Sequence, residues 1–244
     1  KLFLISIFSF CLDYLFLSNV NQPPAWDQGY HLSNLFKMNN LSFLYSNNFN
    51  SLIENGLNIT DNYRGPFTYL VSSLFLQITG NSYKFAYLTN HIFNFIALIS
   101  IYELGKIFKD RNIGIYASLI FSFNTFIFSQ RTDYLIDLSL TAFSSLSFLV
   151  LTRWYISKRK LSIFSVLFGI FLGFVFLIKP SGVSLFILSI FTIFIDKFRK
   201  SSNLYSEIIL SLLAFILVIS PWFFRHWLTI ISSSINAWQW GIKY

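Results

Sequence analysis

Long apolar runs separated by short polar segments dominate this sequence. Most of the runs are long enough for an α-helix to cross about 30 Å of hydrocarbon, since each helical residue rises about 1.5 Å. The pattern predicts an all-α, polytopic membrane bundle of about seven spans. The predicted spans are residues 2–17, 85–105, 113–128, 134–151, 161–178, 183–195 and 208–224.

Two segments depart from this simple pattern. The run at 183–195 is short for a full crossing, so it lies almost untilted, extends back into Pro180-Ser181-Gly182, or is a discontinuous helix. The segment 18–84 is too long for a simple connection, and its apolar stretch at 67–78 is too short to span. We predict surface helices there, the second of them ended by Gly80 and Asn81.

Basic residues give the predicted spans a direction. Ten of the 18 lysines and arginines lie in the three short connections after the second, fourth and sixth spans. The positive-inside rule places these connections in the cytoplasm and residues 18–84 in the first extracytoplasmic loop. Many of the basic residues behind the net charge of +8 are divided among short loops. The net charge therefore reflects membrane topology and does not indicate a nucleic-acid partner.

Composition supports a membrane protein with one domain over residues 1–244. Hydrophobic residues make up 55% of the chain and charged residues only 11%, which excludes an ordinary soluble domain. The chain starts at Lys1 and its single methionine is Met38, so we expect a fragment of a longer protein. We expect a multi-pass integral membrane protein, in the plasma membrane if the source is prokaryotic.

Charged side chains gather on the predicted outer side, where a group facing lipid would cost several kcal/mol. Such groups tend to face a cavity or pair with one another, and both signs are present here. The candidates are Asp27, His31, Arg64, Arg131, Asp133, Asp137, Lys179, Arg225 and His226.

Two carboxylates in this set are four residues apart. A helix beginning near Thr132 would place Asp133 and Asp137 on one face, where a metal ion, a basic phosphate site or Arg131 would relieve their repulsion. The alternative is that Asp133 caps the helix and only Asp137 has a role in chemistry.

The other candidates also have structural alternatives. Arg64 and Lys179 each adjoin a Pro or Gly turn, a common way to line a cavity with donors for phosphate, whereas all the outer cations could instead extend their heads to water. His31 could bind metal or substrate, or be a hydrogen-bonded structural histidine. Asn90 and Asn94 are expected to bond neighbouring helices.

Five short motifs follow one another along almost the whole chain. They are Trp26-Asp27 with Gly29-Tyr30, Arg64 before Gly65-Pro66-Phe67, Arg131 with Asp137 six residues later, Lys179-Pro180-Ser181-Gly182, and Pro221-Trp222. In this order they resemble the GT-C membrane glycosyltransferases. Within that superfamily the chain is most similar to the protein O-mannosyltransferase and lipid A aminoarabinose transferase group.

The resemblance implies roles by position. Asp27 matches the loop aspartate that acts as base or helps to bind a metal, and Asp137 matches a second acidic position that could share this metal. Arg64 and Lys179 match cations near the lipid phosphate, and Arg131, His31 and Arg225 are further substrate-binding candidates. The family often has Asp-Glu where this chain has Asp27-Gln28, so this chain has no second carboxylate beside Asp27. The family also often has Pro-Pro where this chain has Gly65-Pro66.

The predicted function is transfer of a sugar from a polyprenyl-phosphate donor to a glycolipid, glycan or protein acceptor on the extracytoplasmic side, with inversion. A divalent metal ion is the only cofactor expected, and membrane lipid is a further partner. Two alternatives are a transporter or flippase for lipid-linked sugars and a non-catalytic membrane subunit. A transporter would carry functional polar residues near the membrane midplane and related halves.

Overall fold

The computed structural model describes residues 1–19, 24–45, 49–58, 64–80, 82–157, 163–198 and 204–243. These residues are almost entirely helical and contain no β-strand. The elements are α1 (Leu2–Asn19), α2 (Trp26–Tyr45), α3 (Phe49–Asn58), α4 (Phe67–Thr79), α5 (Tyr83–Leu88), α6 (Asn90–Phe108), α7 (Arg111–Ser122), α8 (Thr125–Thr132), α9 (Asp137–Ile156), α10 (Ile163–Ile178), the 3₁₀ helix η1 (Pro180–Phe186), α11 (Ile187–Phe198) and α12 (Leu204–Lys243).

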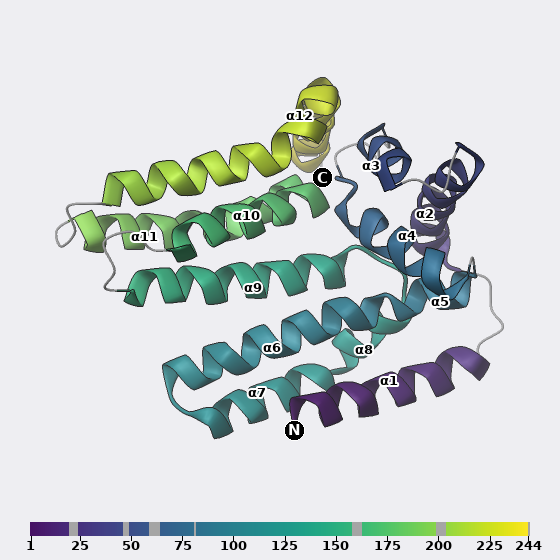
Figure 1. Ribbon diagram of the computed structural model, residues 1–244, viewed down its shortest axis with the longest axis horizontal. Coiled ribbons are helices and arrows are strands. Elements are labelled where there is room, and N and C mark those ends of the chain that lie inside the picture. The colour runs from purple at the N-terminus through teal and green to yellow at the C-terminus, as the bar shows by residue number, and fades with distance from the viewer. Residues whose placement is uncertain are drawn as a thin grey trace.

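The long helices lie side by side and form a bundle, and α2 to α5 gather at one of its ends (Figure 1). Helix α6 packs against α7 and α9, and α10 packs against α9 and α12. Helix α1 packs against α6, α7 and α8. The all-α bundle, with helices between the first two predicted spans, is therefore confirmed.

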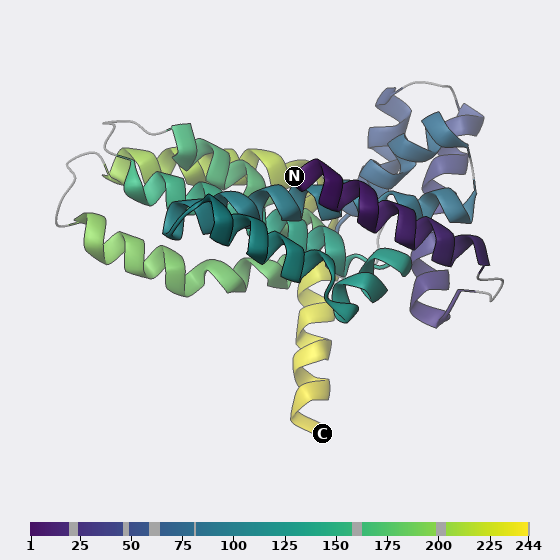
Figure 2. The same cartoon turned by 90° about the horizontal axis from the view of Figure 1, so that it is seen from below.

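Helix α12 has two limbs. Its first limb runs along the bundle, and the second turns away from the bundle direction (Figure 2). Pro221 lies inside this helix, and a proline in a helix interior removes one backbone hydrogen bond and favours a kink. The first limb approaches α10 closely at Gly169, where a Cβ atom would lie 2.0 Å from the carbonyl oxygen of Ser211.

The bundle exposes apolar side chains over much of its surface, as a protein solvated by lipid does. Ile120, Leu188 and Leu217 are more than two-thirds exposed. Among the described residues, three helices have the length and composition to cross a membrane: Leu2–Asn19, Lys84–Phe108 and Leu204–Asn236. A fourth crossing results if the bent pair α7 and α8 counts as one. The total of about seven spans stays a prediction.

The structure corrects two details of the predicted spans. The run at 113–128 is not one straight helix, because α7 and α8 meet at an angle of 61° and Asn124 caps the start of α8 by accepting from the amide of Phe126. The next helix begins at Asp137, and Asp133 has an extended backbone. Asp133 and Asp137 are therefore not stacked on one helical face, and Asp133 does not cap α9.

Two other expectations about helix ends are confirmed. Gly80 ends α4 with φ of 104°, a left-handed conformation that glycine adopts without steric cost. Asn81 lies outside the described residues. The short run at 183–195 extends back to Pro180, where η1 precedes α11.

Candidate functional site

The site is built where the segment before α4 meets the end of α10. The amide of Gly65 donates to the carbonyl oxygen of Ile178 at 3.3 Å. A Cβ atom at position 65 would lie 2.0 Å from the carbonyl oxygen of Leu177, so only glycine fits this backbone contact. Arg64 and Lys179, which are 115 residues apart in sequence, thus flank the same backbone hydrogen bond.

The first turn of α4 is wedged between α9 and α10. The hydroxyls of Thr68 and Ser139 are 2.6 Å apart and both are buried. The ring of Phe67 stacks on Phe174 at 4.5 Å and meets Phe143 edge to face at 4.9 Å. These contacts hold the backbone of Arg64 and Gly65 against α9, which begins at Asp137, and α10, which ends just before Lys179.

A buried histidine connects Arg64 to α2. Only 2% of His31 is exposed, and its Nδ1 lies 2.6 Å from the Tyr69 hydroxyl. The Nη1 of Arg64 lies 3.2 Å from His31 Nε2. Because a guanidinium only donates, Nε2 accepts here, and Nδ1 carries the ring proton and donates to Tyr69. His31 therefore orients the arginine, the structural role left open by the sequence.

Asp27 lies one helical turn before His31, in the first turn of α2. Its side chain is exposed, and it has no hydrogen bond or ion pair with any residue that the structure describes. The next residue, Gln28, accepts a hydrogen bond from the Tyr87 hydroxyl at 3.3 Å. Helix α2 thus presents an exposed carboxylate four residues before the histidine that Arg64 contacts.

Lys179 and Asp137 form a loose pair on the other side of the Gly65 contact. Lys179 Nζ lies 3.9 Å from Asp137 Oδ1, and the two side chains are 30% and 47% exposed. Such a half-exposed pair contributes little to stability, so the Lys179 ammonium can turn to another anion at low cost. Asp137 is the first residue of α9, where the helix dipole favours a carboxylate.

The second limb of α12 is tied to α3. Arg225 Nη1 donates to Asn58 Oδ1 at 2.8 Å, and His226 Nε2 donates to the carbonyl oxygen of Leu57 at 2.7 Å. Both residues connect the end of the bundle to the outer-loop helices. Arg225 is exposed, so its remaining donors face outward.

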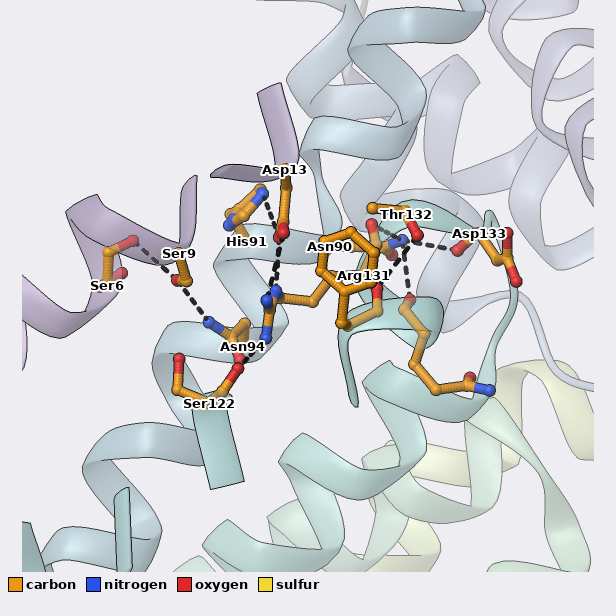
Figure 3. A network of polar contacts seen from close by, with 12 residues as sticks. Ser6, Ser9, Asp13, Asn90, His91, Asn94, Ser122, Arg131, Thr132 and Asp133 are labelled. Carbon is orange, nitrogen blue, oxygen red and sulfur yellow. Dashed lines mark hydrogen bonds and ion pairs between the residues drawn. The ribbon is translucent and has the colours of Figure 1, made fainter. Parts of the chain in front are cut away.

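Arg131 belongs to a buried polar network and not to the site around Lys179. It is 1% exposed, and its guanidinium donates to both carboxylate oxygens of Asp13 and to the carbonyl oxygen of Ser122 (Figure 3). A guanidinium occupied by these three acceptors is poorly suited to bind substrate. Asp13 was missed by the sequence analysis, although it is the single charged residue in the run 2–17 and an intramembrane carboxylate calls for a partner.

The asparagines of α6 bond neighbouring helices, as expected. Asn90 Nδ2 donates to carbonyl oxygens at the end of α8, and Asn94 Nδ2 approaches Ser9 Oγ of α1 at 3.5 Å.

The described side chains of this site provide few metal ligands. Among the described residues there is no group of three or more His, Cys, Asp or Glu side chains that could hold an ion. Asp27 and Asp137 alone would leave most of the roughly six oxygen ligands of a divalent cation to come from other groups. The described side chains alone therefore do not form a metal cage, and the expected metal ion stays a prediction.

A match to a known family agrees with this fold and site. Residues 63–224 match the family described as dolichyl-phosphate-mannose-protein mannosyltransferase, which is of the GT-C type. The match starts next to Arg64 and includes Asp137 and Lys179. The chain therefore belongs to this family and is a membrane glycosyltransferase. No curated protein and no solved structure matches the chain significantly.

Proposed function

We propose that this chain transfers a sugar from a polyprenyl-phosphate donor to a hydroxyl or amine acceptor on the extracytoplasmic side. One observation carries the proposal: the hydrogen bond from Gly65 to Ile178 places two cation-bearing segments together. In addition, His31 links Arg64 to the helix that presents Asp27. A phosphate needs cations, and an acceptor needs a base.

The two cations have different parts in this mechanism. Arg64, oriented by His31, supplies a planar fork suited to two phosphate oxygens, and Lys179 supplies a mobile point charge. Lys179 exchanges its 3.9 Å contact with Asp137 for the phosphate when the donor binds. Both cations then stabilise the negative charge that grows on the departing phosphate.

The transfer step is a single displacement. The Asp27 carboxylate takes the proton of the acceptor O–H or N–H as the acceptor atom attacks the anomeric carbon of the sugar. The bond between that carbon and the phosphate oxygen breaks, and its electron pair leaves with the polyprenyl phosphate. The configuration at the anomeric carbon inverts.

The two ends of the bundle support an extracytoplasmic orientation of the site. Helices α2 to α5 and the site lie at one end, and the turn between α6 and α7 lies at the other (Figure 1). That turn carries Lys106, Lys109 and Arg111, which favour the cytoplasm. We therefore assign the site to the extracytoplasmic face.

The test compares Asp27→Asn with wild type in transfer from a purified polyprenyl-phosphate sugar. The amide has the same shape and caps a helix about as well, so loss of activity reports loss of the base. We expect the rate to fall by about 100-fold to 10,000-fold.

The matched control is Asp110→Asn, since Asp110 caps α7 at the opposite end of the bundle and should leave the rate unchanged. Equal rates for wild type and Asp27→Asn at matched protein levels would remove Asp27 from the mechanism.

A further inference from the structure

We propose that Asp13, Asn90 and Arg131 are positioning residues for sugar transfer, which act through the segment 133–136 on Asp137 and Lys179. This inference rests on the proposed function, because it concerns how the site at Lys179 is held in place. It gives a role to a buried polar network that takes no direct part in the transfer step.

Three buried side chains make up the network, and they come from three helices (Figure 3). Asp13 of α1 and Asn90 of α6 are fully buried, and Arg131 of α8 is 1% exposed. Polar groups buried in an apolar bundle are costly unless they are hydrogen-bonded. Here the arginine meets the carboxylate in a two-pronged contact, with Nη2 3.1 Å from Asp13 Oδ1 and Nε bonded to Oδ2.

Arg131 also holds the break between α7 and α8. Its Nη1 donates at 2.6 Å to the carbonyl oxygen of Ser122, the last residue of α7. A carbonyl at a helix end has no partner within its own helix, so the arginine supplies one. The guanidinium therefore fixes the bent pair α7 and α8 against α1.

Asn90 holds the other end of α8. Its Nδ2 lies 2.8 Å from the carbonyl oxygen of Asp133, 3.1 Å from that of Arg131 and 3.3 Å from that of Gln130. These carbonyl groups belong to the last turn of α8 and to Asp133, which begins the extended segment that leads to α9. Since Asn90 is on α6, the segment is fixed to the neighbouring helix.

The segment held in this way leads directly into the site. Only residues 134–136 separate Asp133 from Asp137, and Tyr134 and Ile136 are buried with exposures of 1% and 2%. A segment fastened at Asp133 and packed at 134 and 136 gives Asp137 little freedom. Asp137 in turn faces Lys179. A shift of α8 would therefore reach the Lys179 ammonium.

His91 completes the surroundings of the network. Its Nε2 lies 3.3 Å from Asp13 Oδ2, and the ring of Phe10 meets it edge to face at 4.9 Å. The buried carboxylate is thereby enclosed between α1, α6 and α8. A positioning role fits these contacts better than substrate binding by Arg131.

The first experiment is a double-mutant cycle between Arg131→Lys and Asp137→Asn, measured as kcat and KM of transfer. Lysine keeps the charge but loses the fork, and a displacement of about 1 Å can cost up to about 100-fold in rate. We expect Arg131→Lys to lower kcat by about 10-fold or more with little change in KM. In the Asp137→Asn background it should lower kcat by no more than about twofold, because residues that act as a unit are not additive.

The matched control is Arg153→Lys. Arg153 forms an ion pair between helices with Glu103 at 2.6 Å, far along α9 from Asp137. The control should leave kcat unchanged in both backgrounds. If Arg131→Lys multiplies independently with Asp137→Asn, the network only stabilises the fold and the inference is wrong.

The second experiment does not depend on transfer. Spin labels at Leu135→Cys and Ser181→Cys, in a Cys11→Ala background, report the distance between the segment and η1. Asn90→Ala removes the amide clamp without leaving a charge unpaired, so this variant should fold. We expect a wider or shifted distance distribution in Asn90→Ala than in the parent protein.

The two experiments separate the inference from the proposed function. A broadened distribution in Asn90→Ala together with no transfer by the wild type would retain the positioning and reject the lipid-phosphate mechanism. Transfer by the wild type with an unchanged distribution would retain the mechanism and reject the positioning.

Discussion

The amide of Gly65 donates a hydrogen bond to the carbonyl oxygen of Ile178, and this contact joins two motifs that are distant in the sequence. Proline lacks the amide proton that this bond requires. The bond also brings together the segments that carry Arg64 and Lys179, on which the proposed phosphate binding depends.

Replacing Gly65 should therefore damage the site. Gly65→Ala puts a Cβ atom 2.0 Å from the carbonyl oxygen of Leu177, so the backbone must move at a cost of about 1–3 kcal/mol. We expect lower thermal stability in detergent and a higher KM for the lipid donor. Gly29→Ala is the control, since a Cβ there meets nothing within 4 Å. Wild-type kinetics for Gly65→Ala would show that the contact does not set the site.

The cations should affect donor use more than acceptor use. Arg64→Ala and Lys179→Ala each remove one phosphate contact, and charge-assisted contacts are worth about 1.5–3 kcal/mol. We expect the donor KM to rise or kcat/KM to fall by about 10-fold to 100-fold. Arg64→Lys should retain part of the activity, because the charge remains and the fork is lost.

Lys106→Ala serves as the control for these variants, because Lys106 is half exposed and pairs with Glu103 at the other end of the bundle. Kinetic measurements with a purified polyprenyl-phosphate sugar decide the matter. Equal losses at positions 64, 179 and 106 would indicate general destabilisation instead of phosphate binding.

The buried pair of α1 and α8 should dominate stability. Asp13→Asn leaves Arg131 charged and without a carboxylate, and breaking a buried pair in this way costs about 3–5 kcal/mol. Replacing both partners with apolar residues, Asp13→Leu with Arg131→Met, should recover most of this loss. Denaturant unfolding in detergent measures both variants. A double variant as unstable as Asp13→Asn would show that the loss does not arise from an unpaired charge.

The direction of the bundle is open to a labelling test. In a Cys11→Ala background, a cysteine at the exposed position Glu54 of α3 should react with a membrane-impermeant maleimide in intact cells. A cysteine at Lys109, at the opposite end, should react only after the cells are opened. Reaction at Lys109 in intact cells would reverse the assigned orientation.

The sequence by itself determined the class of fold and the elements of the site. Apolar length and the distribution of lysine and arginine are local properties, so they predicted an all-helical membrane bundle and its two sides. Turn chemistry located the end of α4 at Gly80, and it offered Pro180, where η1 starts, as one possible start of the helical segment before α11. The motifs around Asp27, Arg64 and Lys179 indicated the family, which the match over residues 63–224 confirms. Their catalytic and binding roles stay predictions.

Only the tertiary structure decided which of these polar residues meet. Arg131 and Asp13 are 118 residues apart, and no local pattern in either helix shows that one faces the other. The break at Asn124 also depended on packing, because the apolar content of 113–128 is that of a continuous span. The contact between Gly65 and Ile178 also depends on tertiary packing. A backbone contact between distant segments requires complementary shapes at both surfaces, and the hydropathy pattern contains no information about shape.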